Sequence, residues 1–184
     1  TVAEGCCLGA ELAESASAED LTKAYDVFRQ EALDVNPEYT PKSVNTDGWR
    51  GTQAAWRVLF ASVAIVRCFL HAWLKIRDRA KHLDEQYREI SQRVWEAYRA
   101  PNRRSFSQRI ASLKTWSQRH LNGIVLECVT DLCDKRDLWS VAYGQPGCYR
   151  TSNMLDRIMR SMNRYFDNGQ HMHGSVRASL AHCR

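Results

Sequence analysis

The chain has 184 residues, of which 44% are hydrophobic and 26% are charged, with only 9 Gly and 4 Pro. This composition excludes collagen-like, low-complexity and intrinsically disordered classes. One domain of this length buries about 70% of its unfolded surface, enough for a sizeable core without disulfide staples. The seven cysteines are odd in number and contain no CxxC pair, which favours reduced thiols over a secreted disulfide framework.

The longest apolar stretch, residues 58–74, contains Arg67 and His71. It also falls short of the ~20 residues that a membrane helix needs, so we interpret it as protein core. No basic segment followed by an apolar segment marks a signal peptide. We therefore expect a cytoplasmic protein with no membrane partner.

Charge is distributed unevenly along the chain. Residues 1–48 carry a net charge of −7, whereas the remaining residues carry +12. A basic surface of that size binds polyanions by releasing counterions, and nucleic acid is its commonest partner. The alternative is a set of ordinary solvated helical faces.

The first third of the sequence alternates between expected strands and helices. Apolar, partly alternating residues predict a strand over 6–14. Ser17 is placed to cap a helix that ends at Asn36-Pro37. Three further elements are expected in this part, namely a strand over 43–46, a helix over 52–60 and a strand over 63–68.

The rest of the sequence shows helical periodicity. It predicts helices over residues 74–99, 105–120, 124–134 and 153–166. We find no internal repeat and no linker rich in Gly or Ser. The predicted organisation is an α/β domain, 1–79 with 149–184, interrupted by a helical insertion over 80–148.

Three short motifs contain residues capable of catalysis or metal binding. Asp47 stands where a β-branched strand runs into Gly48, a position that holds a carboxylate at a sheet edge and suits metal ligation. Taken alone, however, the pattern favours a simple Asp-Gly turn residue. Cys68 and His71 form a Cys-x-x-His that, taken alone, fits a buried thiol and a hydrogen-bonded core histidine. Asp156 lies three residues after Asn153, which fits a capped helix start.

In this order, the motifs resemble the catalytic domain of DDE transposases, close to Mutator-like and bacterial insertion-sequence enzymes. The resemblance rests on Val44-Asn-Thr-Asp47-Gly-Trp, Cys68-Phe-Leu-His71 and Arg150-Thr-Ser-Asn-Met-Leu-Asp156-Arg, and it covers nearly the whole chain. It implies an RNase H-like core interrupted by a large all-helical insertion. It also implies a fragment, with the first acidic residue and its N-terminal strands upstream of Thr1, and with Arg184 inside the final helix.

The resemblance assigns roles to individual residues. Asp47 matches the second acidic residue of the family, and Asp156 stands where the third, usually Glu, is found. Both would be catalytic metal ligands, with two Mg²⁺ or Mn²⁺ ions supporting cleavage and transfer of DNA strands. Cys68 and His71 match a signature that lies near the site. The implied protein is a nucleoid-associated bacterial enzyme that acts as a homodimer or higher oligomer on transposon ends and target DNA.

Basic residues provide candidate phosphate contacts, which position DNA without reading its sequence. In the insertion the candidates are Arg103 and Arg104, which could equally be solvated side chains. The better candidates surround Asp156 and are Arg150, Arg157, Arg160 and Arg164, although Arg157 could instead pair with Asp156 or Asp47. Three tryptophans of the insertion, Trp95, Trp116 and Trp139, fit the core better than a base-stacking surface.

Two other hypotheses for the function stay open. One is a degenerate transposase relative that binds DNA or partners without cutting, and the other is a helical zinc-binding regulator built on the cysteines and on histidines such as His171, His173 and His182.

Overall fold

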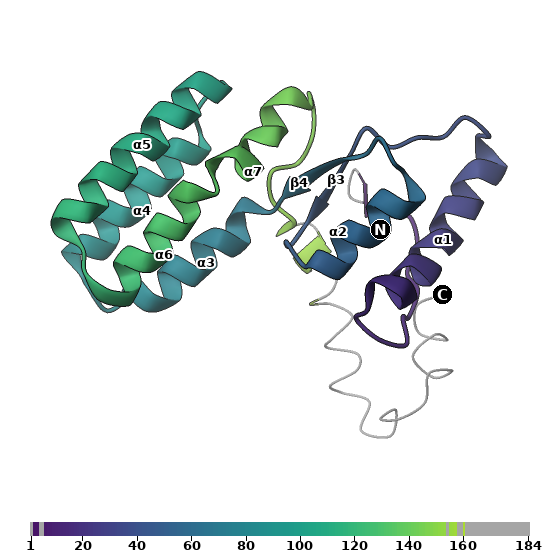
Figure 1. The fold of residues 1–184 in the computed structure, drawn as a ribbon, viewed down its shortest axis with the longest axis horizontal. Coiled ribbons are helices and arrows are strands. Elements are labelled where there is room, and N and C mark those ends of the chain that lie inside the picture. The colour runs from purple at the N-terminus through teal and green to yellow at the C-terminus, as the bar shows by residue number, and fades with distance from the viewer. Residues whose placement is uncertain (1, 4–5, 154, 158–159, 161–184) are drawn as a thin grey trace. The chain divides into compact units, whose positions relative to one another are not determined.

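The computed structural model describes residues 2–3, 6–153, 155–157 and 160 of the chain (Figure 1). The described part is mostly helical, with a small two-stranded parallel sheet, and this is compatible with the predicted α/β class. Its strands are β1 (Val2–Ala3), β2 (Cys6–Cys7), β3 (Ser43–Thr46) and β4 (Ala64–Arg67). Its helices are α1 (Ala18–Val35), α2 (Arg50–Leu59), α3 (Phe69–Ala80), α4 (Glu85–Tyr98), α5 (Arg103–His120), α6 (Gly123–Asp134), α7 (Arg136–Ser140) and the short 3₁₀ helix η1 (Val141–Gly144).

The chain divides into two compact units. The first unit comprises Thr1–Val63 together with Ser152–Arg184, and the second, which we call the helical unit, comprises Ala64–Thr151. The predicted insertion over 80–148 lies inside the helical unit. The unit is larger than predicted because α3 packs into the same hydrophobic cluster as the helices that follow it.

In the first unit, α1 begins and ends where the sequence predicts. The Ser17 hydroxyl accepts a hydrogen bond from the Asp20 backbone N–H at 3.1 Å, which satisfies one of the free donors of the first turn. The helix packs against α2, and aromatic rings fill the space between them. Trp56 of α2 stacks on Tyr25 at 5.2 Å between ring centroids and meets Phe28 edge-on at 6.1 Å.

The structure confirms two of the predicted strands and corrects the third. The predicted strand over 43–46 is confirmed as β3, and the one over 63–68 is confirmed as the slightly shorter β4; together these strands form the parallel sheet. The strand predicted over 6–14 is wrong beyond Cys7, because residues 8–14 have no regular secondary structure. Cys6–Cys7 instead pairs with Val2–Ala3 in an antiparallel ladder.

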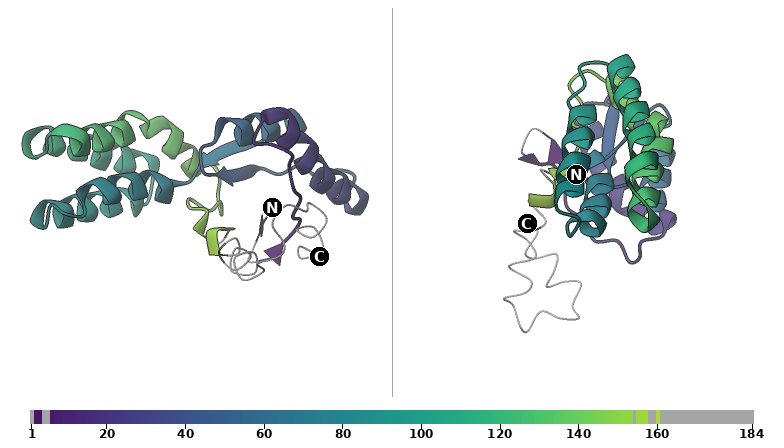
Figure 2. Two further views of the ribbon diagram at one scale, coloured as in Figure 1. Left: turned by 90° about the horizontal axis from the view of Figure 1, so that it is seen from below. Right: turned by 90° about the vertical axis from the view of Figure 1, so that its left-hand side faces the viewer.

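The helical unit contains a four-helix bundle. Around the bundle, α3 contacts α4, α4 contacts α5, α5 contacts α6, and α6 returns to α3 (Figure 1). Linkers of only two to four residues join consecutive helices, as expected for antiparallel neighbours. Figure 2 shows from two further sides that these teal and green helices run alongside one another.

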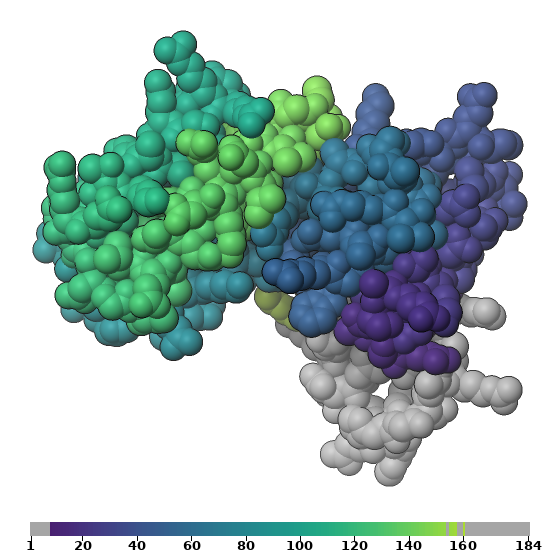
Figure 3. All heavy atoms as spheres, viewed as in Figure 1, coloured from purple at the N-terminus to yellow at the C-terminus, as the bar shows by residue number. Residues whose placement is uncertain are grey.

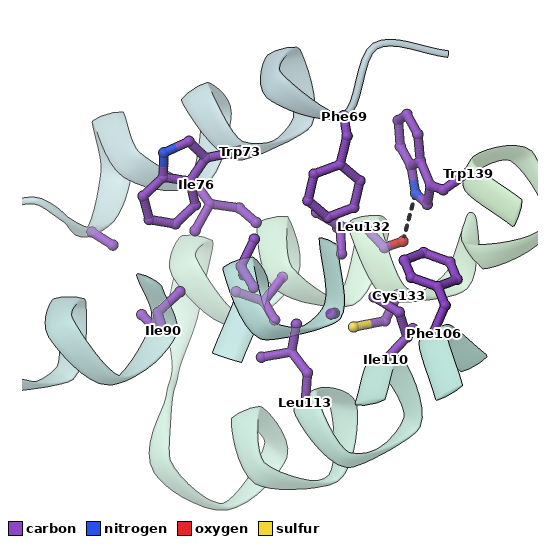
Figure 4. Packing of buried hydrophobic residues seen from close by; sticks show 14 of the residues in the cluster. Phe69, Trp73, Ile76, Ile90, Phe106, Ile110, Leu113, Leu132, Cys133 and Trp139 are labelled. Atoms are coloured by element: carbon purple, nitrogen blue, oxygen red, sulfur yellow. Dashed lines mark hydrogen bonds between the residues drawn. The ribbon is translucent and has the colours of Figure 1, made fainter. Parts of the chain in front are cut away.

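One hydrophobic cluster fills the bundle (Figure 4). Its members come from α3 to α7, and Phe106, Ile90 and Ile76 are completely buried. Phe106 meets Phe69 edge-on at 6.4 Å. Trp139 closes the cluster, and its indole N–H donates to the Leu132 carbonyl at 3.0 Å, so that this polar group is satisfied inside the core.

The helix predicted over 74–99 is wrong as a single element, because it is two helices, α3 and α4, with a break at residues 81–84. The break contains Asp84, whose φ of 43° is compatible with a turn and not with a continuing helix. Neither Gly nor Pro occurs in residues 81–84, so no local signal predicts the break. Residues 105–120 and 124–134, in contrast, are confirmed as α5 and α6 to within two residues.

The two ends of the helical unit lie together. The backbone N–H of Phe69, the first residue of α3, donates to the carbonyl of Arg150 at 3.0 Å. The unit therefore leaves the chain and returns to it at one place, as an inserted domain does. The described helices include none that is long and apolar enough to cross a membrane.

Candidate functional site

Asp47 lies in a tight turn directly after β3. Its carboxylate Oδ1 accepts a hydrogen bond from the Trp49 backbone N–H at 2.9 Å, which forms an Asx turn before α2 begins at Arg50. Gly48 adopts a φ of 99°, a conformation that residues with a Cβ rarely adopt. The turn fixes the direction of the Asp47 side chain. Because Asp47 is exposed, the rest of its carboxylate faces solvent.

A second contact fixes this turn. The indole N–H of Trp49 donates to the Ala16 carbonyl at 3.1 Å, and a Cβ on Gly51 would lie 2.9 Å from that same carbonyl oxygen. Only glycine fits this approach without a shift of the backbone. The loop that carries Asp47 is thus held against the segment that precedes α1.

Asp156 belongs to the same unit as Asp47 and lies near the start of a helical segment, since residues 153, 155–157 and 160 are helical. Its backbone N–H donates to the Ser152 carbonyl at 3.0 Å, and its half-buried carboxylate accepts from the Ser152 hydroxyl at 3.1 Å. We predicted Asn153 as the residue that precedes the helix, but that position is occupied by Ser152. The Ser152–Asp156 pair sets the direction of the Asp156 side chain.

Cys68 and His71 lie in the helical unit, at the junction of β4 and α3. Cys68 is 1% exposed and immediately precedes α3, whereas His71 is half-buried in the first turn of that helix. Among the other described cysteines, Cys128, Cys133 and Cys148 are free thiols. Burial raises the pKa of the Cys133 thiol to about 12, with Asp134 adding to the effect.

The two metal hypotheses, Mg²⁺ or Mn²⁺ on carboxylates and zinc on cysteines and histidines, require different ligands. Asp47 and Asp156 supply hard carboxylate oxygens, the ligands that Mg²⁺ and Mn²⁺ prefer, and they are two of the three acids that the resemblance requires. Among the described residues, no group of three or more His, Cys, Asp or Glu is arranged to hold a metal. The donors of the zinc reading at His171, His173, His182 and Cys183 lie outside the described residues.

The predicted DNA-contacting arginines have different surroundings. Arg104, Arg157 and Arg160 are exposed, and Arg103 lies 3.9 Å from Asp137 in a surface ion pair. Arg164 lies outside the described residues.

Arg150 is half-buried among aromatic rings. Its guanidinium carbon lies 4.6 Å from the ring centroids of both Tyr98 and Tyr143 and 5.8 Å from that of Phe106. It also donates to the Tyr98 carbonyl at 2.5 Å. We call Arg150 with Tyr98, Tyr143 and Phe106 the Arg150 cage. The sequence did not predict it because its members are scattered along the chain. The structure gives Arg150 a packing role there.

The three insertion tryptophans pack as follows. Trp139 is 7% exposed and belongs to the hydrophobic cluster, which confirms the core reading for this residue. Trp95 is half-buried and meets Tyr98 edge-on at 5.2 Å. Trp116 packs against the cluster and stacks on His120 at 5.0 Å.

No protein-family model, no curated protein and no solved structure matches the chain.

Proposed function

We propose that the chain is part of a DDE-type DNA transposase, a metal-dependent polynucleotidyl transferase with an RNase H-like core. The observation that supports this most is the placement of the two acids. Asp47 and Asp156 belong to one compact unit and each lies at an end of a regular element, although 108 residues separate them in the sequence. A helical unit with adjoining ends occupies most of that separation. This is the order of parts that the resemblance implies.

In the proposed reaction, Asp47 and Asp156 would hold the divalent ions. Bound there, such ions would supply Lewis-acid activation of a water or a 3′-hydroxyl and charge stabilisation for the leaving oxygen of a phosphodiester. The Asx turn holds Asp47 in place through the Trp49 N–H, and the Ser152 hydroxyl orients Asp156.

Basic side chains near Asp156 support the choice of DNA as substrate. Arg157 and Arg160 follow Asp156 in the same helical segment and are exposed, so they can position phosphates close to the acid. The helical unit adds a net charge of +7. Non-specific attraction of this kind concentrates DNA at the protein before any chemistry occurs.

Strand transfer by the protein expressed with its upstream coding sequence tests the proposal, because the resemblance places the first acidic residue before Thr1. We expect nicking and strand transfer in Mg²⁺ or Mn²⁺. Asp47→Asn and Asp156→Asn each remove a metal ligand, so each should reduce both activities by at least about 10³-fold. Asp34→Asn is the matched control, because Asp34 is an exposed carboxylate on α1. Activity that survives both site substitutions would refute the assignment.

A degenerate relative that binds DNA without cutting is the second candidate. It is favoured by Asp156 itself, which is one methylene shorter than the usual Glu and is already hydrogen-bonded to Ser152. Asp156→Glu separates the two readings. Restored or increased strand transfer supports an enzyme, whereas DNA binding with no strand transfer in either form supports the binding module.

A further inference from the structure

Charge is segregated between two neighbouring helices of the helical unit. Helix α5 carries five basic residues and no acidic residue over its 18 residues, whereas α6, which packs beside it, carries three acidic residues and no basic residue. The basic residues of α5 are Arg103, Arg104, Arg109, Lys114 and Arg119. The positive charge of the unit is therefore concentrated on one element.

Only part of that helix is available to a partner. Phe106, Ile110, Leu113 and Ser117 are buried in the bundle. The opposite side is exposed along its whole length, and we call it the outer face of α5. It comprises Arg104, Gln108, Ala111, Ser112, Thr115, Gln118 and Arg119.

The arginines of the outer face differ from the other basic residues of α5. Lys114 pairs with Asp134 at 2.5 Å, Arg103 lies 3.9 Å from Asp137, and Arg109 donates to the Glu96 carbonyl. In the part of the chain that the structure describes, the side chains of Arg104 and Arg119 form no ion pair or hydrogen bond. Their guanidinium groups are free to bind an anion.

The chemistry of the outer face fits a phosphate backbone. Its side chains are hydrogen-bond donors such as arginine, glutamine, serine and threonine, with a single alanine and no carboxylate. Serine, threonine, glutamine and arginine all donate to DNA phosphates, and arginine does so bidentately. The face lacks the bulky apolar side chains with which amphipathic helices enter a lipid surface or a protein groove.

The length of the face also fits a duplex. Arg104 and Arg119 are 15 residues apart, or about 22 Å along the helix axis at roughly 1.5 Å per residue. The B-DNA major groove is about 12 Å wide, so arginines at the two ends reach phosphates on either side of it. Figure 1 shows α5 at the upper left, and Figure 3 shows atoms of this teal segment at the surface in the same view.

We propose that the outer face of α5 binds the phosphate backbone of duplex DNA through Arg104 and Arg119, without reading base sequence. The choice of DNA rests on the proposed function, but the binding requires neither Asp47 nor Asp156. This contact would hold DNA on the helical unit independently of the strand-transfer chemistry.

Salt-dependent binding of a labelled mixed-sequence duplex of about 30 bp, roughly three helical turns, tests the proposal on the 184-residue chain. The test variant is Arg104→Gln with Arg119→Gln, since glutamine keeps a similar helix propensity. We expect its affinity near 0.1 M salt to fall roughly 10- to 100-fold and the slope of log K against log salt to decrease by about 2.

Lys75→Gln with Arg79→Gln is the matched control. Both residues are exposed on α3 of the same unit, so this variant loses the same charge from a different helix. We expect its affinity to stay within about twofold of the original chain, because bulk charge alone contributes weakly at that salt. An equal loss of DNA affinity in both variants would show that only the net charge of the protein matters, and it would overturn the proposal.

The other outcomes of the DNA-binding experiment also support or overturn the proposal. Unchanged binding in the Arg104/Arg119 variant overturns it, as does loss of binding to heparin or phosphatidylserine vesicles without loss of binding to DNA. Thermal unfolding confirms that the variants remain folded. Weakened DNA binding by the variant supports this surface even if the protein with its upstream sequence shows no strand transfer, a result that would refute the enzyme. Strand transfer by that longer protein, together with unchanged DNA binding by the variant, would support the enzyme and overturn this surface.

Discussion

The two units of the chain are built around different kinds of core. In the helical unit, aliphatic and aromatic residues from five helices form one cluster whose centre is completely buried. In the first unit, the described core is mainly a set of touching rings between α1, α2 and the loop at Tyr39. Buried aliphatic layers exclude water from every helix of a bundle, whereas a ring cluster between two helices protects fewer amides. We therefore expect the helical unit to be the more stable of the two.

The largest expected effect tests that difference directly. Phe106 is 0% exposed and lies in ring contact with Phe69 and Tyr143, so Phe106→Ala creates a cavity in the centre of the bundle. We expect a loss of about 3–5 kcal/mol from the helical unit. Hydrogen exchange followed peptide by peptide measures this loss in α5 and α6 separately from α1 and α2.

Ser112→Ala is the control for that substitution, since it alters the exposed side of the same helix and should change stability by less than about 0.5 kcal/mol. The mirror substitution is Trp56→Ala in the first unit, where Trp56 is 5% exposed. It should speed exchange in α1 and α2 and leave α5 unchanged. Faster exchange in both units after either substitution would show that they unfold together.

Arg150→Ala should have the next largest effect. The guanidinium lies over Tyr98 and Tyr143 and donates to the Tyr98 carbonyl, so its removal leaves that carbonyl and two ring faces without their cation. We expect a loss of about 2–4 kcal/mol from the helical unit, measured by urea unfolding.

Arg150→Lys sharpens the interpretation of that loss. It keeps the charge but lacks the planar guanidinium, so it should recover only about half of the stability. Full recovery would show that charge alone matters. No loss in Arg150→Ala would mean that the half-buried arginine contributes to binding and not to packing.

These residues also show what the sequence could reveal and what it could not. Helix α1 and strand β3 follow from local signals, a serine cap with helical periodicity and a short β-branched run, and both were predicted correctly. The Asp47 turn was likewise visible in the Asp-Gly pair. The Arg150 cage was not visible, because Arg150 and Tyr98 are 52 positions apart and only the closed bundle brings them together. The break at Asp84 escaped prediction since it lacks Gly or Pro, and the role of Ser152 was assigned to its neighbour.

Alkaline pH should weaken the helical unit through Cys133. Burial raises the pKa of this thiol from 9.0 to about 12, so the unfolded chain loses the proton at a lower pH than the folded chain. The stabilising difference is complete below pH 9 and is lost as the pH rises toward 12. At pH 10.5 the loss is on the order of 2 kcal/mol, at about 1.4 kcal/mol per pKa unit.

Cys133→Val isolates this contribution because valine does not ionise. The free energy of unfolding of the original chain, relative to the valine variant, should fall between pH 8 and pH 10.5. Tyrosine ionisation affects both proteins alike and cancels in the comparison. A constant difference over this range would show that solvent reaches the thiol in the folded state.

The smallest effects come from two helix caps, one in each unit. Asn102 caps α5 by accepting from the Ser105 N–H at 2.8 Å, and Ser17 caps α1 by accepting from the Asp20 N–H at 3.1 Å. Replacing either cap by alanine should cost about 1 kcal/mol, whereas Asn102→Asp and Ser17→Thr should retain most of it. Because the chemistry is the same at both sites, any difference in outcome reports on the surrounding unit. If the units are independent, Ser17→Ala speeds hydrogen exchange only in the first unit and Asn102→Ala speeds it only in the helical unit. Faster exchange in the unit that was not substituted would require energetic coupling between the units, which neither core provides alone.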